Sequence, residues 1–105
     1  MAGMSAYGPA LFVTRTDGAA LSGDERATLL DVIARACRRR GFRGTPRAYD
    51  ETGFLLHSGY GYHQMPDDIR AEREESWIGH GLRVGEEVER TFPGVYAFRT
   101  YAVED

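Results

Sequence analysis

The segment from Ser22 to Arg40 constrains the fold most, because it predicts one amphipathic helix with a single buried stripe. Ser22 and Glu25 have the spacing of a capping box, in which each side chain binds a backbone amide at the start of a helix. Gly41 follows the segment and is a natural residue to end it. At helical spacing the apolar residues fill one arc: Leu29, Leu30, Val32, Ile33, Ala36 and Cys37. A helix of this kind must bury its stripe against another element.

Strand patterns lie on both sides of this helix. Ala10–Thr16 contains three consecutive apolar residues, which is typical of a strand covered on both faces. Thr45–Tyr49 and Phe54–Ser58 predict a short hairpin, and Pro46 places its first strand at a sheet edge. Val95–Val103 is rich in strand-forming residues and predicts the last strand.

A second helix is expected to begin at Pro66, where proline and acidic residues occupy the first turn, and to run to about Trp77. Gly79 and Gly81 are expected to interrupt it. A further helical piece is expected over Val84–Phe92, since its apolar residues recur every four positions. The sequence therefore predicts a broken second helix.

The resulting order is β-α-β-β-α-β in one α+β domain that spans residues 1–105, with residues 1–8 flexible. This order predicts a ferredoxin-like two-layer sandwich with a long loop after the third strand. In such a sandwich both helices cover the same face of the sheet. The last strand nevertheless carries apolar residues on both sides, with Tyr96 and Phe98 on one and Val95, Ala97, Tyr101 and Val103 on the other.

Two interpretations of the second face remain open. An uncovered apolar face usually marks an interface or a ligand site, so a second subunit, a partner or a ligand is expected on it. Alternatively, the irregular segment Gly59–Arg83 folds back over this face.

Composition excludes several classes of protein. A formal net charge of −3 argues against a general nucleic-acid binder. Cys37 is the single cysteine, so no internal disulfide can form, and no segment resembles a membrane span or a secretory signal. The expected location is the cytoplasm. All 13 basic residues are arginine, and lysine and asparagine are absent, which indicates a GC-rich genome such as that of a high-GC bacterium.

A loop rich in glycine and tyrosine follows the third strand and is the one candidate catalytic segment. It contains His57, Tyr60, Tyr62 and His63, which could supply a general base and hydrogen-bond donors. The alternative is a surface loop that packs on the core. The chain's three histidines match no metal-binding spacing, so neither a metal nor another cofactor is expected.

Charged residues are segregated along the chain. A basic cluster surrounds the end of the first helix, and an acidic stretch follows the loop. The residues expected to bind a partner are Arg38, Arg39, Arg40, Arg43, Trp77, Glu86, Glu87 and Glu89. Arginine pairs well with carboxylates and clustered charge steers association, although both charged regions are also typical of solvated helix surfaces.

Two functional hypotheses follow. The first is a small non-enzymatic protein-binding module, regulatory, immunity-like or adaptor-like, that uses an apolar sheet face and segregated charge to bind a protein partner or a second copy of itself. The second is a small dimeric enzyme or small-molecule-binding protein with a pocket lined by the His57–His63 loop. The absence of a catalytic motif favours the first hypothesis.

Overall fold

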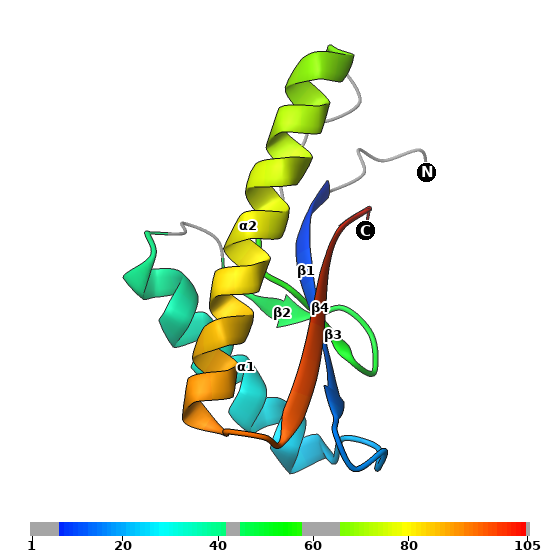
Figure 1. Cartoon of the computed structure of the whole chain (residues 1–105), viewed down its shortest axis with the longest axis vertical. Coiled ribbons are helices and arrows are strands. Elements are labelled where there is room, and N and C mark those ends of the chain that lie inside the picture. The colour runs from blue at the N-terminus through cyan, green and yellow to red at the C-terminus, as the bar shows by residue number, and fades with distance from the viewer. Residues whose placement is uncertain (1–6, 42–44, 58–65, 105) are drawn as a thin grey trace.

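One antiparallel sheet of four strands is covered on one face by two helices (Figure 1). The computed structural model describes residues 7–41, 45–57 and 66–104. Along the chain the elements are β1 (Tyr7–Arg15), α1 (Gly23–Arg39), β2 (Arg47–Ala48), β3 (Gly53–Leu55), α2 (Asp67–Thr91) and β4 (Tyr96–Glu104). The predicted α+β class, with two helices and four strands, is confirmed.

The strands lie in the order β2-β3-β1-β4, and every neighbouring pair is antiparallel. β1 and β4 pair over their full lengths, from Tyr7 opposite Glu104 to Arg15 opposite Tyr96. β2 and β3 are much shorter, so β1 and β4 form the frame of the sheet. β4 is therefore a long strand at one edge of the described sheet.

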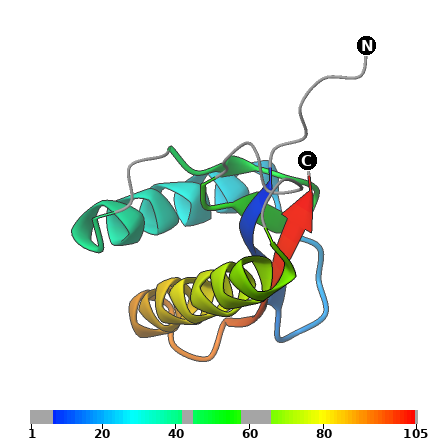
Figure 2. The same ribbon diagram turned by 90° about the horizontal axis from the view of Figure 1, so that it is seen from above.

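The first helix has the structure that its sequence predicts. The side chain of Ser22 accepts a hydrogen bond from the Glu25 amide at 3.1 Å, and the Glu25 side chain accepts one from the Ser22 amide at 3.1 Å. The buried residues of α1 form the expected stripe: Leu29, Val32, Ile33, Ala36 and Cys37. They pack against Leu11 and Val13 of β1 and against α2 in one core. Figure 2 shows α1 and α2 side by side on one side of the sheet.

The prediction of a broken second helix is wrong, because α2 is continuous over 25 residues. Gly81 and Gly85 are buried where α2 crosses β4. A Cβ atom on Gly81 would lie 1.9 Å from Thr100 Oγ1, and one on Gly85 would lie 2.3 Å from the Phe98 ring. These glycines therefore allow close packing of helix on strand, which offsets the roughly 1 kcal/mol that each costs in a helix.

Some element boundaries also differ from those predicted. Tyr7 and Gly8, expected to be flexible, belong to β1. β3 begins one residue early because Asp50 Oδ1 accepts hydrogen bonds from the Thr52 and Gly53 amides at 3.0 and 2.6 Å, which forms the hairpin turn. The predicted loop after β3 lies largely outside the described residues.

Candidate functional site

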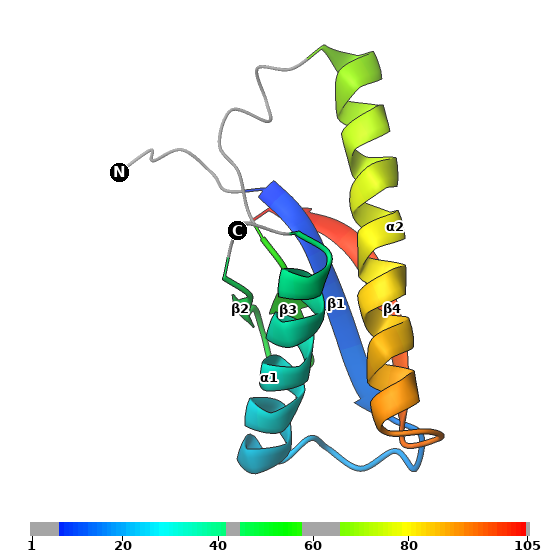
Figure 3. The same ribbon diagram turned by 90° about the vertical axis from the view of Figure 1, so that its left-hand side faces the viewer.

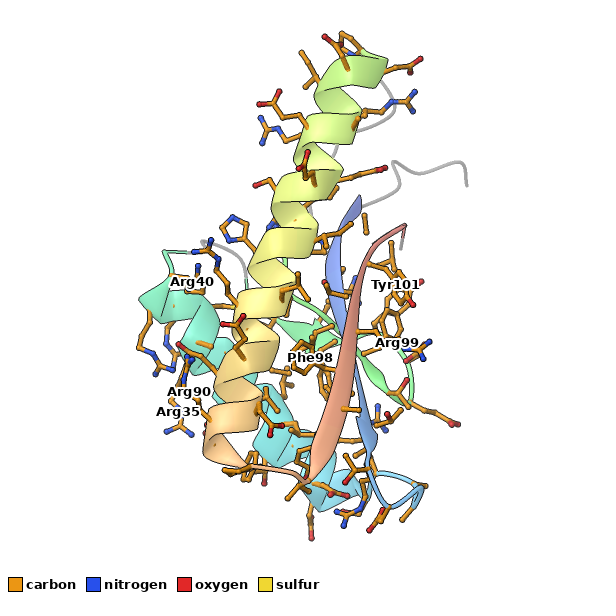
Figure 4. The ribbon with its side chains drawn as sticks, in the orientation of Figure 1. Arg35, Arg40, Arg90, Phe98, Arg99 and Tyr101 are labelled. Carbon is orange, nitrogen blue, oxygen red and sulfur yellow. The ribbon has the colours of Figure 1, made fainter. Side chains whose placement is uncertain are left out.

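The face of the sheet that turns away from the helices carries exposed aromatic side chains. We call it the open sheet face; it lies on the far side of the strands in Figure 3, which views the sheet from the helix side. The Phe12 ring makes edge-to-face contacts with Tyr49 and Tyr101, at centroid separations of 6.0 and 5.7 Å. Tyr101 is 50% exposed. Arg99 and Tyr101 lie on this side of β4, whereas Phe98 lies on the helix side (Figure 4). A shallow hollow of about 260 Å³ lies beside Phe12, lined also by Thr14, Ala97 and the Phe98–Arg99 segment.

The outer edge of β4 presents backbone groups that pair with no strand of the described ranges. The Thr16 amide donates to the Val95 carbonyl at 2.9 Å, which fixes the alternation of hydrogen bonds between β1 and β4. The odd-numbered residues of β4 therefore bond to β1, and the even-numbered residues direct their amide and carbonyl groups outward. Among the described residues no strand lies on that side. The outward-directed backbone groups belong to Tyr96, Phe98, Thr100, Ala102 and Glu104.

Two apolar side chains of α2 lie beside this edge. Ile78 is 38% exposed and Leu82 is 44% exposed. Helical spacing places Ile78 and Leu82 next to Gly85, which contacts β4. Glu87 lies on the opposite side of α2, where it binds Arg39 of α1. The free edge of β4 is thus bordered on the helix side by apolar surface.

Of the candidate catalytic residues, the structure describes only His57; Tyr60, Tyr62 and His63 lie outside the described residues. His57 is half-buried and packs edge-to-face on Trp77, with ring centroids 6.0 Å apart. Burial lowers the pKa of His57, and the nearby His80 lowers it further. His57 is therefore uncharged at neutral pH and contacts the core.

The residues expected to bind a partner have varied surroundings. Arg38 and Glu86 are exposed, and Arg40 is half-buried. Arg39 binds Glu87, which also lies 3.6 Å from Arg90. Glu89 accepts a hydrogen bond from the Gly94 amide at 3.0 Å, and Trp77 is only 9% exposed. Arg43 lies outside the described residues. Opposite charges therefore pair partly within the chain, and Trp77 anchors α2 to the core.

Cys37 is buried in the core, as its position on α1 predicts. Burial, with a smaller contribution from Glu87, raises the pKa of Cys37 to about 11. The thiol is therefore protonated at neutral pH and lacks the character of a nucleophile.

A polar cluster that the sequence did not reveal joins three elements at the other end of the molecule. The Tyr96 hydroxyl donates to Glu25 Oε2 at 2.7 Å, and Arg15 binds both Glu25 and Asp17. The hydrogen bond from Tyr96, followed by that from the Ser22 amide, lowers the pKa of Glu25. The capping box identified Glu25, but partners on β1 and β4 could be found only from the fold.

We expect Glu25→Gln to lower the melting temperature at pH 7, whereas Asp24→Asn, at the exposed neighbouring position, should change it little. A carboxyl group with a lowered pKa stabilises the fold above its unfolded pKa, about 4.3, and this contribution is lost as the pH falls through the folded value. The difference in melting temperature between the wild type and Glu25→Gln should therefore shrink below about pH 4. Thermal unfolding followed by circular dichroism measures both melting temperatures as a function of pH. A difference in melting temperature that is independent of pH would contradict this role for the carboxylate.

No three His, Cys, Asp or Glu side chains of the described ranges are grouped so that they could hold a metal ion. Neither α1 nor α2 combines the length and apolar character of a membrane-crossing helix. Comparison with models of known protein families, with curated proteins and with solved structures found no match to this chain.

Proposed function

We propose that this protein is a non-enzymatic protein-binding module that associates with a second copy of itself along the free edge of β4. The observation that carries the proposal is the row of outward-directed backbone groups on a nine-residue edge strand. Such an edge is a template for another strand. Natural proteins usually protect long edges with lysine, proline or inward charges, and β4 contains only Arg99 and Glu104 as charged residues.

The sequence of β4 is self-complementary in an antiparallel register centred on Thr100. Phe98 then lies opposite Ala102 of the second copy, and Tyr96 lies opposite Glu104. On the open sheet face Arg99 lies opposite Tyr101, which permits a cation–π contact. A shift that centres the pairing on Arg99 would place two arginines opposite each other, so charge favours the Thr100 register.

The Thr100 hydroxyl gives independent support. Its oxygen is buried and has no hydrogen-bond partner within the described part of the chain. Buried polar atoms normally have partners. In the proposed register the same hydroxyl of the second copy lies directly across the two-fold axis, where threonine pairs form hydrogen bonds. Ile78 and Leu82 of the two α2 helices would cover the helix side of the junction.

We further propose that the arrangement is a ferredoxin-like sandwich in the cytoplasm. The element order and the strand order β2-β3-β1-β4 support the ferredoxin-like assignment. Joining two β4 edges would give one continuous sheet with both pairs of helices on the same side. The aromatic open sheet faces of both copies would then form one surface, available to a further protein partner.

Ala102→Pro should abolish the dimer, because it removes an outward-directed amide while leaving the bonds between β4 and β1 intact. Each dimer loses two hydrogen bonds and gains unpaired carbonyls, so the dissociation constant should rise about a hundredfold or more. Ala102→Ser keeps the amide and is the matched control. Sedimentation equilibrium measures the association against the monomer mass of 11.7 kDa.

Leu82→Glu provides a second test that does not alter the strand, because this side chain is 44% exposed in the monomer. It should also weaken the dimer by placing like charges beside the two-fold axis. A wild-type protein that remains monomeric at about 1 mM, where an association of about 4 kcal/mol would be visible, rules out the second copy as the partner. Unchanged dimers in both variants would instead exclude the β4 edge.

A further inference from the structure

A hollow lined by cationic side chains lies between the end of α1 and the middle of α2, on a different flank of α2 from Ile78 and Leu82. Its volume is about 310 Å³, and its lining residues are Arg40, Ser76, Gly79, His80 and Arg83. Arg40 follows the last turn of α1, beside α2 (Figure 4). The other four residues occupy two turns of α2. Gly79 has open space where a Cβ atom would stand, so it leaves room at the hollow.

The two arginines of this hollow differ from several other arginines of α1 and α2, which form ion pairs. Arg35 binds Asp31 at 3.0 Å, Arg39 binds Glu87, and Arg70 binds Asp67. Neither Arg40 nor Arg83 has an ion pair with any residue that the structure describes. The Nε atom of Arg40 is moreover buried and lacks a hydrogen-bond partner among the described residues. A buried guanidinium donor without a partner is costly and indicates a missing acceptor.

The imidazole of His80 completes the hollow. Burial lowers the pKa of His80, and the positive charges of Arg40 and Arg83 lower it further. His57, which packs on Trp77, lies close enough to His80 that His80 contributes to lowering the pKa of His57. Glu87, one turn after Arg83 on α2, is bound by Arg39. Two guanidinium groups therefore converge on this hollow, and its lining residues include no Asp or Glu of the described part of the chain.

We propose that the hollow formed by Arg40, Ser76, His80 and Arg83 binds the phosphate group of a small phosphorylated molecule. A single guanidinium fork satisfies a planar carboxylate, whereas two guanidinium groups, a hydroxyl and an imidazole that approach from two elements suit a tetrahedral oxyanion with several acceptors. This site is separate from the proposed dimer edge and does not depend on it.

The test is a titration of the wild-type protein with inorganic phosphate at pH 7, followed through the imidazole proton resonances of His80 and by calorimetry. Saturable binding is expected, accompanied by a rise in the pKa of His80, because the bound anion stabilises the imidazolium form. Acetate, a carboxylate, should bind more weakly, and sulfate distinguishes oxyanion geometry from a requirement for phosphate.

Arg83→Gln should weaken phosphate binding at least about tenfold, because it removes charge-assisted hydrogen bonds. Arg90→Gln is the matched control: it makes the same charge change two turns along the same flank of α2, outside the hollow, and should bind as wild type does. The proposal is overturned if phosphate produces no saturable shift of His80, or if both variants lose affinity equally, since the latter would show only a general effect of net charge. Tighter binding of acetate than of phosphate would also overturn it.

Discussion

Phe54→Ala is expected to destabilise the protein by about 3–5 kcal/mol, the cost of removing a large aromatic side chain from a packed core. Phe54 is 1% exposed and belongs to the same core cluster as Leu11, Ile33 and Val84. It thus joins the short strand β3 to both helices. Urea denaturation measures the change as a lower transition midpoint with an unchanged slope.

Tyr101→Ala is the control, because it removes an aromatic side chain of similar size from the opposite face of the sheet. Tyr101 is half exposed and contacts Phe12, so its loss should cost only about 1 kcal/mol in the monomer. Equal destabilisation by Phe54→Ala and Tyr101→Ala would contradict a sheet that buries Phe54 against the helices and leaves Tyr101 half exposed on the opposite face.

Gly81→Ala is expected to lower the free energy of unfolding by about 2 kcal/mol. A Cβ atom there would lie 1.9 Å from Thr100 Oγ1 and 2.8 Å from Thr100 Cβ, so α2 must move away from β4. The gain in helix propensity, about 1 kcal/mol, is smaller than the cost of this displacement. Thermal unfolding of wild type and variant measures the difference.

Gly79→Ala, two residues earlier in the same helix, should have the opposite sign. No heavy atom lies within 4 Å of the position that its Cβ would take. The substitution therefore gains helix propensity without a clash and should stabilise the protein by about 0.5–1 kcal/mol. If Gly79→Ala and Gly81→Ala change the stability of the protein in the same direction, α2 does not lie against β4 at Gly81.

Local sequence signals predict the first helix, whereas the roles of the two glycines of α2 depend on long-range contacts. The capping box at Ser22 and the apolar stripe of α1 are local signals, and they placed that helix within one residue at each end. Read locally, Gly79 and Gly81 predict a break in the second helix, but α2 is continuous there. Only the position of Thr100, on a strand nearly twenty residues away, explains Gly81 as a packing residue.

The candidate sites depend even more on tertiary structure. The alternation of apolar residues in β4 predicted a strand with two apolar sides. It could not show that β4 lies at the sheet edge, because strand order is a long-range property. Similarly, Arg40 was predicted as part of a basic cluster, but its proximity to His80 and Arg83 follows only from the packing of α1 on α2.

The most direct test of the proposed association is amide hydrogen exchange along β4, compared between concentrated and dilute protein. The amides of Arg99 and Tyr101 bond to β1 and should be protected at both concentrations. Those of Phe98, Thr100 and Ala102 point outward and should be protected only in the concentrated sample, where a second β4 strand pairs with them. Even-numbered amides that exchange rapidly at every concentration would contradict pairing at this edge.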